Sequence, residues 1–271
     1  MTDFIVERII IACDAVAENH AGIEIAARLA EFWNTALHAV FLQDESLLNL
    51  AALPFARQIG LGADTSESLD ESEIIRHFEA NASRFRATLE VAAREHAVAS
   101  SFAVVRGQPT LAALSIDERD FLVIEATARP FAGQFRLASR WLAAALEAHR
   151  PVLLVRNRGQ TDGVMALVQA KGPSIQRMIA AAAGLALAGN RKLTVRILGE
   201  AASADEVRAW VTKIDARLGA RCRIENVSRR GTFFEDGEGS ILVVDADPAV
   251  NDLASLRNLA MRSRADILFV W

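Results

Sequence analysis

Short apolar strands alternate with amphipathic helices along the whole chain, and the order of these elements recurs after about half of its 271 residues. The apolar run at residues 8–13 is typical of a buried strand, whereas the spacing over residues 21–33 gathers apolar side chains on one helix face. Repeated strand–helix alternation predicts parallel sheets with right-handed crossovers. We therefore expect an α/β fold with two tandem domains.

The expected elements follow the same order in both halves. In the first half we expect strands over 8–13, 36–42, 102–105, 121–124 and 152–155, and helices over 21–33, 71–97, 109–116 and 137–148. In the second half we expect strands over 164–168, 193–197, 222–227, 241–244 and 267–270, and helices over 175–188, 204–218 and 253–263. The polar segment 156–163 is expected to link domains 1–157 and 163–271.

Three segments of the first half resemble the universal stress protein family. They are IIIACD (9–14), LHAVFLQD (37–44) and ASRWLAAALEAHRPVLLVRN (138–157), in which Pro151 opens the last strand. Segment 43–60 resembles tandem members of this family, and in the second half the resemblance rests on the repeated order and the closing ADILFVW. It implies that each domain is a five-stranded parallel sheet of order 3-2-1-4-5 sandwiched by helices. It also implies an intramolecular pseudo-dimer through the fifth strands, which covers two sheet edges.

The glycine motif that this resemblance implies is degenerate in the first domain. Nucleotide-binding members of the family carry G-x2-G-x9-G-S/T after the fourth strand, since backbone amides must approach the phosphates closely. Aligned on Pro151, this chain has Glu125, Ala128 and the pair Ala138-Ser139 at those positions, so all three glycines are replaced. A carboxylate there would repel a phosphate by roughly 3–4 kcal/mol per charge pair at ~4–6 Å, before screening.

The first domain nevertheless keeps residues that could contact an adenine nucleotide. Asp14 matches the acid that the family places near adenine, although it serves equally well as a polar cap at the mouth of the sheet. Ser139 is either a phosphate contact or a cap at the start of the fourth helix. The arginines after the fourth strand either attract an anion or are solvated. The cofactor-binding candidates are Asp14, Leu42, Ser139, Arg129, Arg136 and Arg140.

The second half lacks the motif altogether. Gln169 stands where Asp14 stands in the first half, and Asp245-Ala246-Asp247-Pro248 follows the fourth strand without a glycine series. Two acids at a strand end are compatible with a metal or phosphotransfer site. We expect a strand-end turn instead, because no second cluster of ligands accompanies them. No nucleotide is expected in this half.

Composition and short motifs exclude several classes of function. The net charge of −4 gives no nucleic-acid footprint, and no apolar run reaches the roughly 18 residues of a membrane span. Walker A, GxGxxG, GxSxG and HExxH motifs are absent. Cys13 and Cys222 are expected to be reduced core residues. We expect no signal peptide and a cytoplasmic protein.

One connecting segment stands out by its apolar character. Residues 46–55 (SLLNLAALPF) place Leu47, Leu50 and Leu53 on one face of a short helix. We expect a flap packed over the first domain. A lid or a partner-binding surface is the alternative, because long connections in compact domains are often functional.

These observations favour a non-catalytic stress-response or regulatory protein that acts through protein contacts, with lost or weakened nucleotide binding. No cofactor, metal, nucleic-acid partner or membrane partner is expected, and a homodimer stays open. The alternative is that the first domain binds ATP or another adenine nucleotide, with slow hydrolysis.

Overall fold

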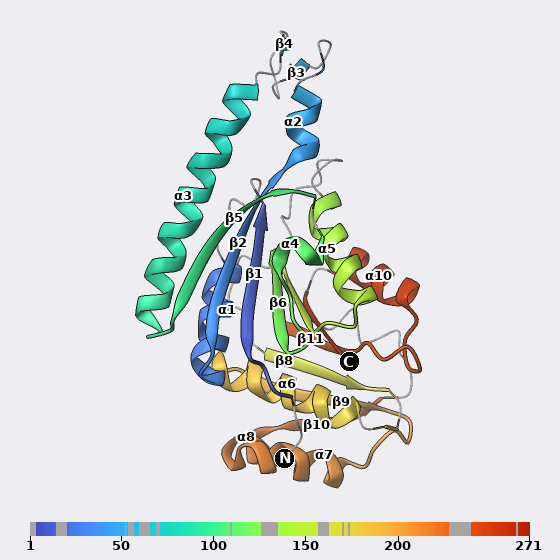
Figure 1. Ribbon diagram of the computed structural model, residues 1–271. Coiled ribbons are helices and arrows are strands. Elements are labelled where there is room, and N and C mark those ends of the chain that lie inside the picture. Colours follow the sequence, from blue (N-terminus) through green and yellow to red (C-terminus); the bar gives the residue numbers. More distant parts are fainter. Residues whose placement is uncertain are drawn as a thin grey trace.

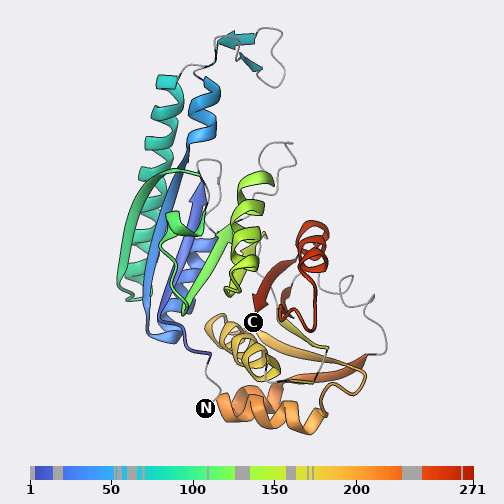
Figure 2. The same cartoon turned by 45° about the vertical axis from the view of Figure 1, so that its right-hand side comes forward.

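The alternating strands build one ten-stranded sheet with helices on both faces (Figures 1 and 2). The computed structural model describes residues 4–14, 21–51, 53, 57–59, 66–68, 71–108, 110–125, 135–156, 163–169, 171–172, 174–227, 240–263 and 265–271. The strand order is β10-β9-β8-β11-β12-β7-β6-β1-β2-β5, so the first half of the chain forms one side of the sheet and the second half the other.

The first half has the predicted strand order 3-2-1-4-5, here β5-β2-β1-β6-β7, with every neighbouring pair parallel. Its strands are β1 (Arg8–Asp14), β2 (Ala36–Asp44), β5 (Ser100–Gly107), β6 (Asp120–Glu125) and β7 (Val152–Val155). Its helices are α1 (Ala21–Trp33), α2 (Glu45–Ala51), α3 (Glu71–Glu95), α4 (Leu111–Leu114) and α5 (Phe135–Glu147).

The second half repeats this order as β10-β9-β8-β11-β12, again with parallel neighbours. Its strands are β8 (Gly163–Val168), β9 (Lys192–Leu198), β10 (Arg223–Val227), β11 (Ser240–Asp245) and β12 (Asp266–Val270). Its helices are α6 (Ser174–Ala188), α7 (Ala204–Ile214), α8 (Ala216–Arg221) and α10 (Leu253–Arg262).

The two halves join through their fifth strands, as predicted for an internal pseudo-dimer. β7 and β12 pair antiparallel, with Leu153 opposite Leu268. The residue after each fifth strand then contacts the other half. Arg156, which follows β7, donates to the carbonyls of Ser263 (2.6 Å) and Ala260 at the end of α10. Trp271, which follows β12, stacks on His149 at the end of α5, with ring centroids 5.9 Å apart.

Alternating side chains of the strands feed two separate cores. In β1, Ile9, Ile11 and Cys13 face one side of the sheet, and Ile10 and Ala12 face the other, as the pleat requires. The first face is covered by α1, α3, α6, α7 and α8, and the second by α4, α5 and α10. Both cysteines are buried, and neither takes part in a disulfide. In the described part of the chain no helix is long and apolar enough to cross a membrane.

One local prediction was wrong. The helix expected over 204–218 is broken at Asp215, whose extended backbone ends α7 and whose carboxylate accepts from the Leu218 amide (2.6 Å) to begin α8. Of the segment 46–55, the structure describes residues 46–51 and 53, and Leu48 of α2 is buried in the core shared with α3. Figure 1 shows α2 running beside the amino-terminal part of α3, beyond the edge of the sheet, with β3 (Arg57–Ile59) and β4 (Ser66–Ser68) at the tip.

Candidate functional site

Parallel sheets of this kind bind ligands at the carboxyl ends of their strands, where the strand order reverses. In this protein the reversal occurs twice. It lies between β1 and β6 in the first half and between β8 and β11 in the second. These two crevices are therefore the places where the sequence-derived candidates have to be tested.

Two candidates lie side by side at the first crevice. Asp14 is the last residue of β1 and pairs in register with Leu42 of β2. The Leu42 side chain is fully buried and belongs to the core beneath α4 and α5. Leu42 is thus a packing residue in this structure, with no exposed surface to offer a ligand.

The remaining candidates lie on or before α5. This helix begins at Phe135, so Arg136 is its second residue and Ser139 its fifth. Ser139 therefore does not cap the helix, and the cap alternative was wrong, because the helix begins four residues before Ser139. Arg140 follows it and is exposed. Arg129 lies outside the described residues.

Glu125 ends β6 and lies directly against the first turn of α1. A methyl group placed at Gly22 would meet Glu125 Oε2 at 3.5 Å and Glu125 Cβ at 3.7 Å. A carboxylate is stabilised at this end of a helix by the helix dipole. The residue that replaces the first glycine of the motif thus lies at the end of β6, against the first turn of α1.

Asp245 is the counterpart of Glu125 in the second half. Ile124, the residue before Glu125, is the last residue of β6 that pairs with β1, opposite Ala12. Val244, the residue before Asp245, is likewise the last residue of β11 that pairs with β8, opposite Leu167. Asp245 is buried and accepts a hydrogen bond from Ser174 Oγ at 2.6 Å, on the first turn of α6. In both halves, therefore, the acid that ends the fourth strand lies against the first turn of the first helix of that half, α1 or α6.

Further hydrogen bonds close the second crevice. The Asn251 amide donates to Gln169 Oε1 (2.7 Å) and to the Asp245 carbonyl (2.6 Å). The Asp247 amide donates to the other Asp245 carboxylate oxygen at 2.9 Å. Asp245 and Asp247 thus organise a strand-end turn, and within the described residues no cluster of three His, Cys, Asp or Glu could hold a metal ion.

Sequence reasoning identified Gln169 and Asp245 but missed Ser174 and Asn251, which lie far from them along the chain. Ser174 could have been found as a small polar residue at the start of a helix, directly after Pro173. Asn251 gives no such signal, because its role depends on how the loop after β11 folds back to β8.

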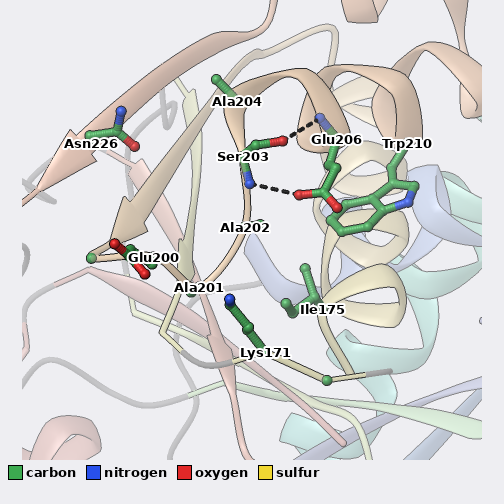
Figure 3. Close-up of a pocket in the computed structure, with 12 residues that line it drawn as sticks. Lys171, Ile175, Glu200, Ala201, Ala202, Ser203, Ala204, Glu206, Trp210 and Asn226 are labelled. Atoms are coloured by element: carbon green, nitrogen blue, oxygen red, sulfur yellow. Dashed lines mark hydrogen bonds between the residues drawn. The ribbon is translucent and has the colours of Figure 1, made fainter.

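A hollow of about 670 Å³ lies beside the second crevice, at the carboxyl ends of β8, β9 and β10. Figure 3 shows Trp210 of α7 on one side of it, Glu200 and Asn226 on the other, and Lys171 between them. None of these residues was a sequence-derived candidate, because they come from four separate segments.

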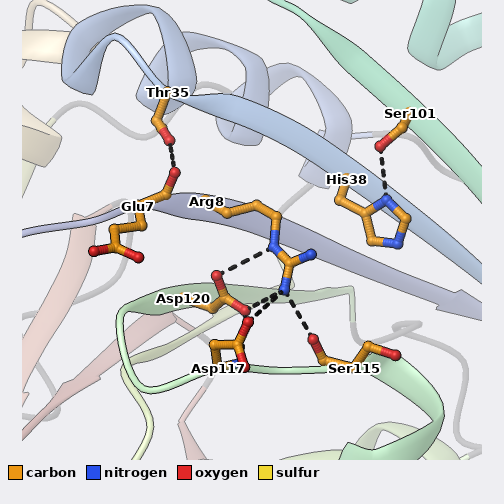
Figure 4. A network of polar contacts seen from close by, with 8 residues as sticks. All are labelled: Glu7, Arg8, Thr35, His38, Ser101, Ser115, Asp117 and Asp120. Carbon is orange, nitrogen blue, oxygen red and sulfur yellow. Dashed lines mark hydrogen bonds and ion pairs between the residues drawn. The ribbon is translucent and has the colours of Figure 1, made fainter.

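A polar network of a different kind lies at the amino-terminal ends of β1 and β6 (Figure 4). The Arg8 guanidinium donates to both carboxylate oxygens of buried Asp120, at 2.6 and 3.2 Å, and to the Ser115 carbonyl at 2.8 Å. Asp120 also accepts from the Asp117 amide at 2.7 Å. Since these groups satisfy one another at the amino-terminal ends of β1 and β6, the network anchors the sheet.

Comparison with known proteins agrees with this architecture. No protein-family model and no curated protein sequence matches the chain. A universal stress protein from Archaeoglobus fulgidus is similar in structure, with a TM-score of 0.60, 10% identity and coverage of 100% of this chain and 98% of its own. A putative universal stress protein from Pseudomonas aeruginosa has a TM-score of 0.54 and 12% identity, and the coverage is 98% and 94%.

The cytoplasmic domain of a prokaryotic cation chloride cotransporter is also similar, with a TM-score of 0.51, 12% identity and coverage of 97% and 95%. At these identities the likeness establishes the fold. The chain has the universal stress protein fold over its full length, as the sequence resemblance implied.

Proposed function

We propose that this protein is a non-catalytic regulatory protein of universal stress protein fold, which acts through protein contacts and carries no nucleotide in either crevice. The observation that carries the proposal is the position of the acid at the end of each fourth strand. Glu125 lies against the first turn of α1, and Asp245 accepts a hydrogen bond from the first turn of α6. On this proposal, residues 1–157 and 163–271 are its two domains.

In the first half, charge and geometry both oppose a bound triphosphate. The Glu125 carboxylate lies where a phosphate-binding glycine would leave space, and like charges at ~4–6 Å repel by roughly 3–4 kcal/mol per pair before screening. Ser139 lies in the second turn of α5, away from the amino end that favours anions. Arg136 and Arg140 remain on this helix as the residues that a competing nucleotide would use.

In the second half, a ligand would have to displace existing hydrogen bonds. The Ser174–Asp245 and Asn251–Gln169 bonds satisfy groups that are buried or half-buried. Breaking them without replacement leaves unpaired buried groups, each of which costs about 1–3 kcal/mol. This arrangement supports a structural role for the second half as the partner of the first.

The solved cytoplasmic domain of a cotransporter supports a role in protein contacts. That domain has the same fold at nearly the same length and belongs to a larger membrane protein. A tandem sheet of this type can therefore work as an attached or associating module, and we extend that role to this chain.

The test is to denature protein purified without added nucleotide and to separate the supernatant by anion exchange. We expect AMP, ADP and ATP to lie far below one equivalent per chain. Recovery is checked by adding a known amount of ATP to a parallel sample before denaturation. Near-stoichiometric nucleotide would overturn the proposal and favour an adenine-nucleotide-binding first domain.

A further inference from the structure

The hollow at the carboxyl ends of β8, β9 and β10 exists because the two halves continue differently after their second strands. After β2 the chain enters α2, which packs against β5 and α3. After β9 it turns at Gly199, whose φ of +61° favours glycine, and reaches α7 within a few residues. The short turn leaves an open space of about 670 Å³, within the range typical of small-molecule sites.

The apolar part of this hollow is formed by two helices. Trp210 of α7 and Ile175 of α6 both line it. The turn between β9 and α7 contributes Ala201 and Ala202, whose small side chains leave space in front of the indole. An indole face with an aliphatic neighbour binds flat or branched apolar groups.

The polar part contains both signs of charge. Lys171 and Glu200 line the hollow and are exposed, and within the described residues neither forms an ion pair. The Asn226 amide lies on the same side as Glu200 and has no hydrogen-bond partner among the described residues (Figure 3). One ammonium, one carboxylate and one amide thus face a common space, and the charge of the Lys171 ammonium also helps to lower the pKa of the nearby Glu206 carboxyl.

Two further polar residues at the hollow already bind each other. Ser203 and Glu206 form a capping box, in which the Ser203 amide donates to Glu206 Oε2 (2.8 Å) and the Glu206 amide to Ser203 Oγ (3.2 Å). These bonds hold the pKa of Glu206 below its usual range, so its carboxylate is charged. Because two carboxylates line the hollow, a simple anion such as phosphate is disfavoured there.

We propose that the hollow binds a free α-amino acid with a large apolar side chain. The ligand carboxylate pairs with Lys171. Its ammonium group pairs with Glu200 and donates to the side-chain carbonyl of Asn226, and its side chain packs on Trp210. A zwitterion matches the mixed charges, and an apolar side chain matches the indole. The inference goes beyond the proposed function, because it concerns the hollow beside the second crevice and uses neither Asp245 nor Ser174.

The experiment is a calorimetric titration of the full chain with L-phenylalanine. We expect saturable binding, and at least tenfold weaker binding of phenylpropionate, which lacks the amine, and of phenethylamine, which lacks the carboxylate. Glycine should also bind at least tenfold more weakly, since it has no group to pack on Trp210. These comparisons use one unaltered protein, so they do not depend on how a variant folds.

Variants then assign the binding to the hollow. Lys171→Met and Glu200→Gln should each weaken L-phenylalanine binding at least tenfold, a loss of about 1.4 kcal/mol. Lys192→Met is the matched control, because Lys192 is an exposed lysine at the start of β9 and does not line the hollow. The proposal is overturned if no saturable heat is seen, if both single-charge analogues bind as well as the amino acid, or if Lys171→Met and Lys192→Met behave alike. If purified protein released near-stoichiometric nucleotide and still bound L-phenylalanine, the proposed function would be overturned and the amino-acid site would stand.

Discussion

Ser174 Oγ donates a hydrogen bond of 2.6 Å to Asp245 Oδ2 inside the second crevice, and both residues are buried. The bond links the first turn of α6 to the end of β11 across the point where the strand order reverses. In the first half Glu125 lies in the same way against α1. In both halves the acid that ends the fourth strand therefore lies against the first turn of the first helix of that half.

Removal of the Ser174 hydroxyl should destabilise the protein measurably. Ser174→Ala leaves one oxygen of a buried carboxylate without its donor, so we expect a loss of about 1–3 kcal/mol in the free energy of unfolding. Urea denaturation monitored by circular dichroism measures it. Ser83→Ala is the control, because Ser83 is exposed on α3. Equal stability of the two variants would show that the Ser174–Asp245 bond does not hold the crevice closed.

The contact between the halves should be sensitive to side-chain size at Gly184 of α6. A methyl group there would lie 3.1 Å from Trp33 Cζ2 and 3.3 Å from Trp33 Nε1 of α1. Gly184→Leu adds still more volume, so we expect a net loss of about 1–3 kcal/mol, although leucine favours helix more than glycine does. The thermal midpoint measures the change.

A double-mutant cycle separates this clash from a general effect on the helix. Trp33→Ala removes the side chain that Gly184→Leu would strike, so the double variant should lose less stability than the sum of the two single variants. Additive losses would show that the effect of Gly184→Leu does not come from its contact with Trp33.

Stability should depend on pH through His96, which joins the end of α3 to α1. Its ring nitrogens lie 2.7 Å from Glu31 Oε2 and 3.2 Å from Glu24 Oε1. Burial lowers the pKa of His96, but the hydrogen bonds with Glu31 and Glu24 outweigh it, and the pKa is raised above 6.5. The stabilisation is therefore complete below about pH 6.5 and is lost as the pH rises through the folded-state pKa.

His96→Gln should cost more stability at about pH 5.5 than at about pH 8.5, with a difference below about 1 kcal/mol. The effect is small because the side chains of Glu24 and Glu31 are 40% and 58% exposed, so solvent screens them. Urea unfolding at both pH values measures it, with His77→Gln on the exposed face of α3 as the control. A larger cost at the higher pH would contradict the assignment.

The alternation of strands and helices could be predicted from local apolar patterns, whereas the strand order was implied by the resemblance to the universal stress protein family. Val152–Val155 and Asp266–Val270 each close one half, and both are wholly buried, since each fifth strand is covered by the other. The break at Asp215 was missed because apolar spacing continues across it, although an Asp followed three residues later by Leu218 is a recognisable helix start.

The candidate site could be predicted only in part. The replaced glycine at Glu125 was visible in the sequence, but the direction of its carboxylate toward Gly22 was not. Leu42 was a candidate contact for a nucleotide and is buried, because β2 is covered on both faces, with Phe41 in one core and Leu42 in the other. The hollow beside Trp210 depends on four chain segments that only the folded sheet brings together.

The most direct test of the account is a calorimetric titration of the full chain with ATP and magnesium. Because Glu125 and Asp245 lie at the ends of the fourth strands, where their charge opposes a phosphate, we expect no saturable heat up to about 1 mM ATP, which corresponds to a binding free energy weaker than about −4 kcal/mol. Saturable binding in the micromolar range, abolished by Asp14→Ala, would contradict the account and show that the first crevice holds a nucleotide.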